Sequence, residues 1–546
     1  MTAVAVHAGA HARGGSLTGT GALVRFALRR DRVRIPVWIA ALTFSTVGSV
    51  STFPTNYPTV GDRQTRAELM TSPTGAALSG PGHGLDDYTF GAMMGNEILG
   101  FLAIFVALMS VLLFVRHTRT EEESGRAELV RAAVVGRHAV TTAALIVVGG
   151  TNLVLGALIV LGLGTSGVES ITWAGSLAFG AGLTAVGLLF TAITAVTAQL
   201  VEYARGAAGL AGALIGLAYA LRAAGDMGDG ALSWLSPIGW AQAMRPYVDE
   251  RWWPLVPAPV LAVALVAVAF ALTSRRDVGA GLVRPRPGPR TGSGFLGTPF
   301  GLALRLHRAA LLWWGTAMFL FGLMYGSLIQ DVESAIEGNR ALREWVAQSP
   351  GTSFTDAFLA LILSMLATIS AIYAILAAQR LRGEETAGRA EPVLATATSR
   401  ARWMSGQLAV ALFGGAAVIL LSALGLGLGA AATAGDAGQL FRILGAGLCY
   451  VPALWVTVGV AVALFGLAPR AIALSWVLLV YALTVGIFSG LLKLPSWTMN
   501  LSPFGHVPQL PGAEFDLLPL VALTALAAAL VAAGLAGFRR RDLHSN

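Results

Sequence analysis

The chain has 546 residues, of which 55% are hydrophobic and only 12% are charged, and its formal net charge is +8. Soluble globular proteins carry about 25% charged residues, so this composition excludes a series of soluble domains, and its high hydrophobicity excludes a disordered chain. The single cysteine, Cys449, excludes a disulfide scaffold.

A bilayer-spanning helix needs about 20 mostly apolar residues. Twelve segments meet or approach that length: 33–53, 95–115, 139–164, 173–200, 207–223, 255–273, 309–329, 356–378, 407–430, 445–468, 471–492 and 518–538. The two weakest candidates are 33–53, which contains Pro36, and 207–223, which ends at Arg222. The sequence therefore predicts an all-α polytopic membrane protein with about 12 transmembrane helices.

The distribution of arginine predicts the orientation of these spans. If both termini are cytoplasmic, the inner segments hold 28 basic and 11 acidic residues, whereas the rest of the chain holds 9 basic and 18 acidic residues. Positive residues favour the cytoplasmic side of a membrane, so both termini are expected inside. Basic clusters flank apolar segments and none is long enough for a nucleic-acid-binding tail, so no nucleic-acid partner is expected.

An internal duplication organises the chain. Residues 119–137 read RTEEESGRAELVRAAVVGR, and residues 382–400 read RGEETAGRAEPVLATATSR, which align without gaps at an offset of 263. Further matches pair Leu235-Ser236-Pro237 with Leu501-Ser502-Pro503 and Arg275-Arg276-Asp277 with Arg540-Arg541-Asp542. The matches predict two homologous six-helix halves, 1–278 and 295–546, in parallel orientation. The Pro/Gly/Arg-rich segment 279–294 between them is expected to be an extended linker.

The duplicated loop after the second span of each half is the sharpest functional signal. Glu122 and Arg126 are four residues apart, as are Glu385 and Arg389, and glutamate before arginine at this spacing favours an ion pair on one helix face. A solvated helix would explain the charges, since such surface pairs contribute at most about 1 kcal/mol. It would not explain why Gly, Arg, Ala and Glu recur in register. We therefore expect a short cytoplasmic helix that docks on a partner.

Two details refine this expectation. Gly125 and Gly388 are expected to allow a close approach of the partner. Pro392 replaces Leu129 of the first copy, so the second copy is expected to turn where the first continues as a helix.

The stretch 22–32 before the first span is amphipathic. Arg25, Arg29 and Arg32 fall on one face of a helix built on this stretch, and apolar residues cover the other. Two interpretations stay open: a helix lying in the membrane interface with its arginines near anionic headgroups, or a simple positive anchor for the first span.

Residues able to do chemistry are scarce. Lys493 is the single lysine and is followed by Leu494, whereas a phosphate-binding loop needs Gly-x4-Gly-Lys-Ser/Thr. The eight histidines show no metal-ligand spacing. The chain is therefore expected to be no enzyme, to bind no metal and to have no cofactor of its own. If transport uses ATP, another polypeptide hydrolyses it.

Twelve spans in two halves, with a Glu-rich Gly-Arg-Ala-Glu loop after the second and eighth, resemble the ABC-2-type permeases. The resemblance is closer to the fused actinobacterial antibiotic and multidrug exporters of the tetronasin-exporter type. It implies a multi-pass protein of the bacterial cytoplasmic membrane whose loops are coupling helices seated on a separate ATP-binding subunit, with two copies per chain and with ATP and Mg²⁺ bound there. Carried over by position, the contact residues are Glu121, Glu122, Gly125, Arg126, Glu128, Glu384, Glu385, Gly388, Arg389 and Glu391.

Two functions follow from these observations. The first is the permease subunit of an ATP-driven exporter, which releases antibiotics, drugs or other hydrophobic or amphipathic compounds by alternating access. The second is an ion-coupled secondary multidrug carrier, which also often has twelve spans in two halves. The lack of acidic residues deep within the spans and the duplicated docking loop favour the first function. No motif marks the residues that bind substrate.

Overall fold

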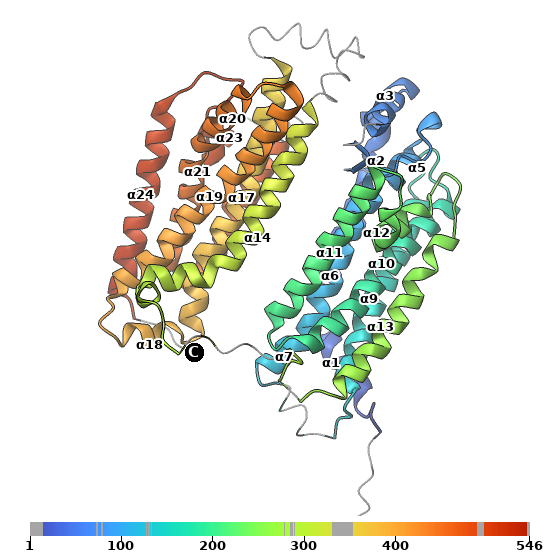
Figure 1. Ribbon diagram of the computed structural model, residues 1–546, viewed down its shortest axis with the longest axis horizontal. Coiled ribbons are helices and arrows are strands. Elements are labelled where there is room, and N and C mark those ends of the chain that lie inside the picture. The colour runs from blue at the N-terminus through green and yellow to red at the C-terminus, as the bar shows by residue number, and fades with distance from the viewer. Residues whose placement is uncertain are drawn as a thin grey trace, which may run out of the picture. The chain divides into compact units, whose positions relative to one another are not determined.

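The computed structural model of the protein describes residues 15–71, 75–77, 80–126, 128, 132, 134–277, 279–283, 288, 290–329, 353–488 and 496–542. These residues form helices joined by loops and contain no strand. The chain divides into two compact units, 1–287 and 288–546. In each unit the long helices run side by side (Figure 1).

Six helices of the first unit are long and apolar enough to cross a membrane: Arg34–Asn56, Phe90–Glu123, Ala139–Gly164, Trp173–Leu200, Ala204–Asp226 and Trp253–Thr273. They are built from the elements α2 (Arg34–Asn56), α5 (Phe90–Met93), η2 (Met94–Ile98), α6 (Leu99–His117), α7 (Arg119–Glu123), α9 (Ala139–Gly164), α10 (Trp173–Leu200), α11 (Ala204–Asp226), η4 (Trp253–Leu255) and α13 (Pro257–Thr273). Shorter or more polar elements are α1 (Thr20–Arg30), α3 (Val60–Thr71), η1 (Leu85–Asp87), η3 (Leu232–Leu235) and α12 (Pro237–Ala243).

Five such helices lie in the described part of the second unit: Pro299–Ser327, Thr355–Thr386, Arg400–Ala434, Gly438–Leu467 and Leu517–Arg540. Their elements are α14 (Pro299–Ser327), α17 (Phe354–Thr386), α19 (Arg400–Ala434), α20 (Gly438–Cys449), α21 (Val451–Leu467) and α24 (Leu517–Arg540). The remaining elements are η5 (Gly294–Gly297), α18 (Ala390–Leu394), η6 (Pro469–Leu474), α22 (Ser475–Phe488), α23 (Ser496–Asn500) and η7 (Pro503–His506).

The predicted all-α polytopic membrane fold is confirmed, with 11 candidate spans among the described residues. The predicted span 471–492 coincides with η6 and α22, which form a shorter apolar helix, and residues 489–495 lie outside the described part. The weak candidate 33–53 is a helix because Pro36 lies in the first turn of α2, where a missing amide hydrogen costs nothing.

Hydroxyl caps determine where several helices begin. Thr298 accepts a hydrogen bond from the amide of Gly301 at 3.0 Å, and Pro299 occupies the first position of α14. Ser236 caps α12 in the same way ahead of Pro237. This combination of a hydroxyl cap and a following proline favours a helix start, so the duplicated Leu-Ser-Pro element in the first unit begins a short helix.

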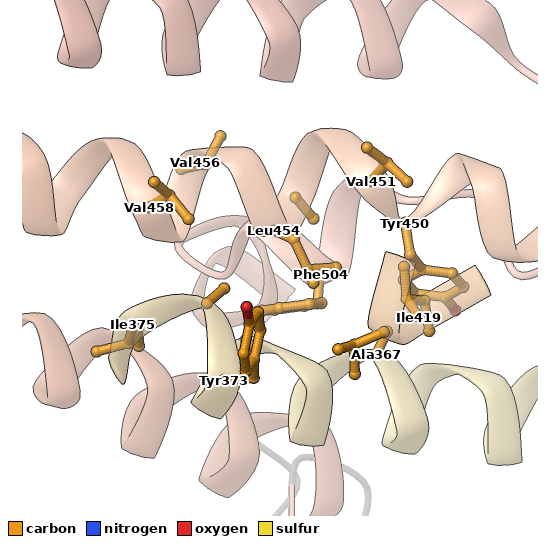
Figure 2. Close-up of a cluster of buried hydrophobic side chains, with 14 of the residues drawn as sticks. Ala367, Tyr373, Ile375, Ile419, Tyr450, Val451, Leu454, Val456, Val458 and Phe504 are labelled. Atoms are coloured by element: carbon orange, nitrogen blue, oxygen red, sulfur yellow. The ribbon is translucent and has the colours of Figure 1, made fainter. Parts of the chain in front are cut away.

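The second and fourth spans of each unit form its centre. For example, 67% of an 18-residue apolar stretch of the span Trp173–Leu200 is buried within the protein. The corresponding share for the span Trp253–Thr273 is 11%. Glycines allow neighbouring helices to touch backbone to backbone: a Cβ at Gly466 of α21 would collide with Gly534 of α24. Figure 2 shows part of the core of the second unit, where Ile419 and Leu454 are fully buried.

The start of the predicted linker 279–294 contacts the first unit. The amides of Leu282 and Val283 donate to the carbonyls of Gln199 and Leu200 at 3.2 and 2.8 Å. This stretch therefore belongs to the first unit, and the boundary at 287/288 falls later within the predicted linker.

Candidate functional site

The duplicated loops lie at the ends of the second span of each unit. α6 ends at His117 and α7 continues to Glu123, whereas the single helix α17 runs to Thr386 and is followed by α18. With 33 residues, α17 is about 50 Å long at 1.5 Å per residue. This exceeds the ~30 Å hydrocarbon core of a bilayer, so its charged last turns extend beyond the hydrocarbon.

Both loop glycines end a helix. The backbone φ angle is +73° at Gly125 and +68° at Gly388, a conformation that strains any residue with a Cβ atom. The amides of Gly388 and Arg389 donate to the carbonyls of Glu385 and Glu384, both at 3.0 Å, which is a Schellman helix ending. No other described segment lies within 4 Å of a Cβ at either glycine. Both glycines stop a helix, and the expected close approach of a partner at these positions stays a prediction.

Glu122 is held by two arginines in the interior of the first unit. Its Oε1 lies 2.7 Å from Nη2 of Arg276, and its Oε2 lies 2.9 Å from Nη1 of Arg119. All three side chains are at most 9% exposed. We call Arg119, Glu122 and Arg276 the first clamp. It ties the end of the second span to the segment that follows α13.

The second unit contains the same arrangement. The two oxygens of Glu385 accept hydrogen bonds from Arg541 at 2.6 and 2.8 Å, and Nη1 of Arg382 lies 3.3 Å away. The guanidinium of Arg541 also lies over the rings of Phe465 and Phe538, 4.9 and 5.1 Å from their centroids. We call Arg382, Glu385 and Arg541 the second clamp. It ties the end of α17 to the end of α24.

The predicted ion pair Glu122–Arg126 is therefore wrong, and in the second loop Glu385 is held by Arg541. Arg126 instead lies 3.9 Å from Glu121, and Arg389 donates to Glu384 at 2.9 Å. Spacing within the loop could not identify the clamp arginines, because each buried carboxylate has a charged partner more than 150 residues away. The sequence did contain a signal for these partners, because the second arginine of the duplicated Arg-Arg-Asp motif is the clamp residue in both halves, Arg276 and Arg541.

Glu121 and Glu384 also have partners within their own unit. Glu121 forms an ion pair with Arg30 at the end of α1, so the amphipathic N-terminal helix contacts the first loop. Glu384 is buried and lies 3.4 Å from Arg380 in addition to Arg389. On α1 the side chains of Arg25 and Arg29 are exposed, as both interpretations of this helix require.

A second set of loop charges faces solvent. Glu128 and Glu391 are exposed, and the side chains of Arg126 and Arg389 are 60% and 56% exposed. We call these four residues the outer charges. The outer charges lie just beyond the glycines that end the helices of Glu122 and Glu385, and the clamps anchor those helix ends.

The second loop forms a helix where a turn was expected. α18 spans Ala390–Leu394 and includes Pro392 in its first turn, where the proline needs no amide partner. The expectation that Pro392 breaks the second copy is thus wrong. Most of the corresponding residues of the first copy, 127, 129–131 and 133, lie outside the described part.

The described residues contain no group of three or more His, Cys, Asp or Glu side chains that could hold a metal ion. What the two loops offer instead is exposed charge of both signs on short, anchored segments. Such a surface suits recognition of another protein, because charge complementarity determines which partner binds and in what register.

Comparison with known proteins gives two matches. The family model described as "Multidrug efflux system permease Rv1217c, C-terminal domain" matches residues 21–272 and 296–539. The multidrug efflux system permease protein Rv1217c of Mycobacterium tuberculosis (strain ATCC 25618 / H37Rv) is 42% identical over 539 residues, which cover 97% of this chain and 96% of that protein.

Proposed function

The chain belongs to the multidrug efflux permease family, and we propose that it is the membrane subunit of an ATP-driven exporter of the ABC-2 type. Its cargo would be drugs, antibiotics or other hydrophobic and amphipathic compounds. The observation that carries this proposal is the pair of outer charge sets, each next to a buried clamp. In this arrangement each loop is a docking point for a separate ATP-binding subunit, with two copies per chain, and ATP and Mg²⁺ are bound on those subunits.

The clamps suggest how movement at the loops reaches the spans. ATP binding draws the two ATPase subunits together and moves the helices that carry the outer charges. Glu122 and Glu385 are one or two turns away and are bound to Arg276 and Arg541. A displaced loop therefore pulls on the ends of the second and the last helix of its unit together. Repeated in both halves, this movement would alternate inward-open and outward-open states.

An ion-coupled carrier is the alternative, and the described acidic residues near span ends argue against it. Glu97 lies 2.9 Å from Arg66, Asp226 lies 3.2 Å from Arg222, and Asp356 lies 3.1 Å from Arg442. Each of these carboxylates forms an ion pair near the end of a span, whereas a proton-coupled carrier is expected to hold ionisable residues deep within its spans as a relay.

The proposed location is the bacterial cytoplasmic membrane with both termini inside, and cysteine labelling tests it. Cysteines replacing Ser124 and Ser293, both exposed in the structure, should be protected from a membrane-impermeant maleimide in whole cells and react after permeabilisation. A cysteine replacing Ser349, which lies outside the described residues, should react in whole cells. Cys449 is buried and gives little background. Labelling at Ser124 from outside would reverse the proposed orientation.

The energy source is tested with purified protein. The chain alone should hydrolyse ATP no faster than a detergent blank, because its single lysine is not in a phosphate-binding loop. Co-expression with an ATPase encoded beside it should give a stable complex, ATP turnover and efflux. A complex that exports only with an imposed proton gradient, and equally well without ATP, would favour the ion-coupled alternative.

A further inference from the structure

The first unit contains a large cavity between α9, α10 and α13. Its volume is about 660 Å³, within the range of small-molecule sites. α9 contributes Gly156, α10 contributes Ala181 and Thr184, and α13 contributes Ala258 and Ala262. The cavity lies entirely within one unit and is distinct from the duplicated loops.

The side chains that line this cavity offer no free hydrogen-bond donor. Its only polar side chains are those of Thr184 and Thr191. Their hydroxyls donate to carbonyls of their own helix, those of Gly180 and Gly187, at 2.8 and 2.7 Å. A polar group brought into this space would be desolvated without compensation, so the part of a ligand that enters must be hydrocarbon.

The cavity opens on an exposed, apolar face of the first unit. Leu153, Leu177 and Val263 lie along it and are 58%, 52% and 71% exposed within the protein. At one end it reaches Leu255, which follows Trp252 and Trp253, and tryptophans favour the membrane–water interface. A compound with an apolar body and a polar head could therefore place the body in the cavity and leave the head at the interface.

Two lining positions of the first half correspond to larger side chains in the second half. In the alignment of the two halves, Gly156 corresponds to Ile419 and Ala258 to Leu523. Ile419 is fully buried in the core shown in Figure 2, and Leu523 is 6% exposed. The two halves therefore differ in side-chain size at these two positions.

We propose that this cavity binds the hydrocarbon body of the amphipathic compound that the permease exports and takes up directly from the bilayer. This inference rests on the proposed export function and assigns to it a binding site in the first half. Specificity at such a site comes from size and shape, because the lining offers no directional contact, and this suits a permease with many substrates.

The test uses the full chain in vesicles of phosphatidylethanolamine and phosphatidylglycerol, with the apolar photolabel trifluoromethyl-iodophenyl-diazirine as probe. We expect labelling of α9, α10 and α13 that falls at least fivefold when rhodamine 6G, an amphipathic dye, is added. Ala181→Leu and Ala258→Leu, which place side chains into the cavity, should each reduce the labelling to a similar extent. Ala264→Leu is the matched control, because Ala264 lies on α13 but is exposed and does not line the cavity.

Efflux by the complex with its ATPase provides the second readout. The two filling variants should raise the rhodamine concentration for half-maximal efflux about tenfold, while the ATPase still binds and the variants remain as thermally stable as the control. Labelling that excess oleate displaces but rhodamine does not would identify the occupant as membrane lipid and overturn the proposal. Unchanged labelling and efflux in both variants would also overturn it. A wild-type complex without any efflux would instead contradict the export function, since photolabelling needs no ATPase.

Discussion

Replacing Glu122 with glutamine is expected to destabilise the first unit by about 3–5 kcal/mol, because the change leaves two buried guanidinium groups without their carboxylate. Arg119 is 1% and Arg276 is 6% exposed, so water cannot replace the lost charge. Glutamine keeps the size of the side chain and part of its hydrogen bonding, so the loss reports the charge itself. The measurement is the thermal unfolding of the purified chain, together with its abundance in the membrane.

Two variants separate the clamp from a general effect of removing charge. Glu123→Gln removes an exposed charge in the same helical turn, while the glutamine oxygen can still accept from the amide of Ala204, which lies 3.1 Å from Glu123. It should change stability by no more than about 1 kcal/mol. The double variant Glu122→Gln/Arg276→Gln also removes one of the two cations that the single variant leaves unpaired. It should therefore recover part of the lost stability. If Glu122→Gln unfolded at the same temperature as the wild-type chain, the clamp would have no structural role.

Much of the fold was predictable from composition and local pattern. A run of about 20 apolar residues can satisfy its backbone hydrogen bonds in a bilayer only as a helix, and this argument holds without knowledge of any tertiary contact. The segment 471–492 was the hardest case, because it meets the apolar criterion while its described helix is shorter. The end of each loop helix was predictable too. A glycine after a charged helical turn favours a left-handed ending, which is what Gly125 and Gly388 provide.

The partners of the loop glutamates were not predictable from spacing. A residue four positions away competes with every charge that tertiary packing brings nearby, and Arg276 is 154 residues from Glu122. Burial decides the outcome, because a buried carboxylate needs a close, well-aligned cation far more than an exposed one does. The cavity between α9, α10 and α13 was hidden for the same reason. It depends on which faces of three helices meet, and no single segment reveals that.

The outer charges give the second prediction, which concerns coupling rather than stability. Glu128→Arg and, separately, Glu391→Arg are expected to abolish export while each chain still inserts into the membrane at normal abundance. Both carboxylates are exposed, so reversing their charge costs the isolated chain little. Against a partner surface arranged for negative charge, the introduced cation meets like charge, which costs several kcal/mol and dissociates or uncouples the ATPase. Because α18 forms despite Pro392, the two loops are expected to be similarly sensitive.

The pattern across variants distinguishes docking from a merely solvated loop. Glu169→Arg reverses an exposed charge between α9 and α10, far along the chain from either loop, and should leave efflux unchanged. Efflux, membrane abundance and co-purification of the ATPase should be measured together. If the outer charges dock the ATPase, the charge-reversed variants lose efflux and co-purification but keep their membrane abundance. The clamp variant Glu122→Gln is instead expected to lower the abundance of the chain in the membrane. If the double variant Glu128→Arg/Glu391→Arg exported at the wild-type rate with the ATPase still bound, the outer charges would not be the docking surface. The ATPase would then have to engage the chain elsewhere, and the duplication would reflect only the clamps that hold the second and last helices of each half together.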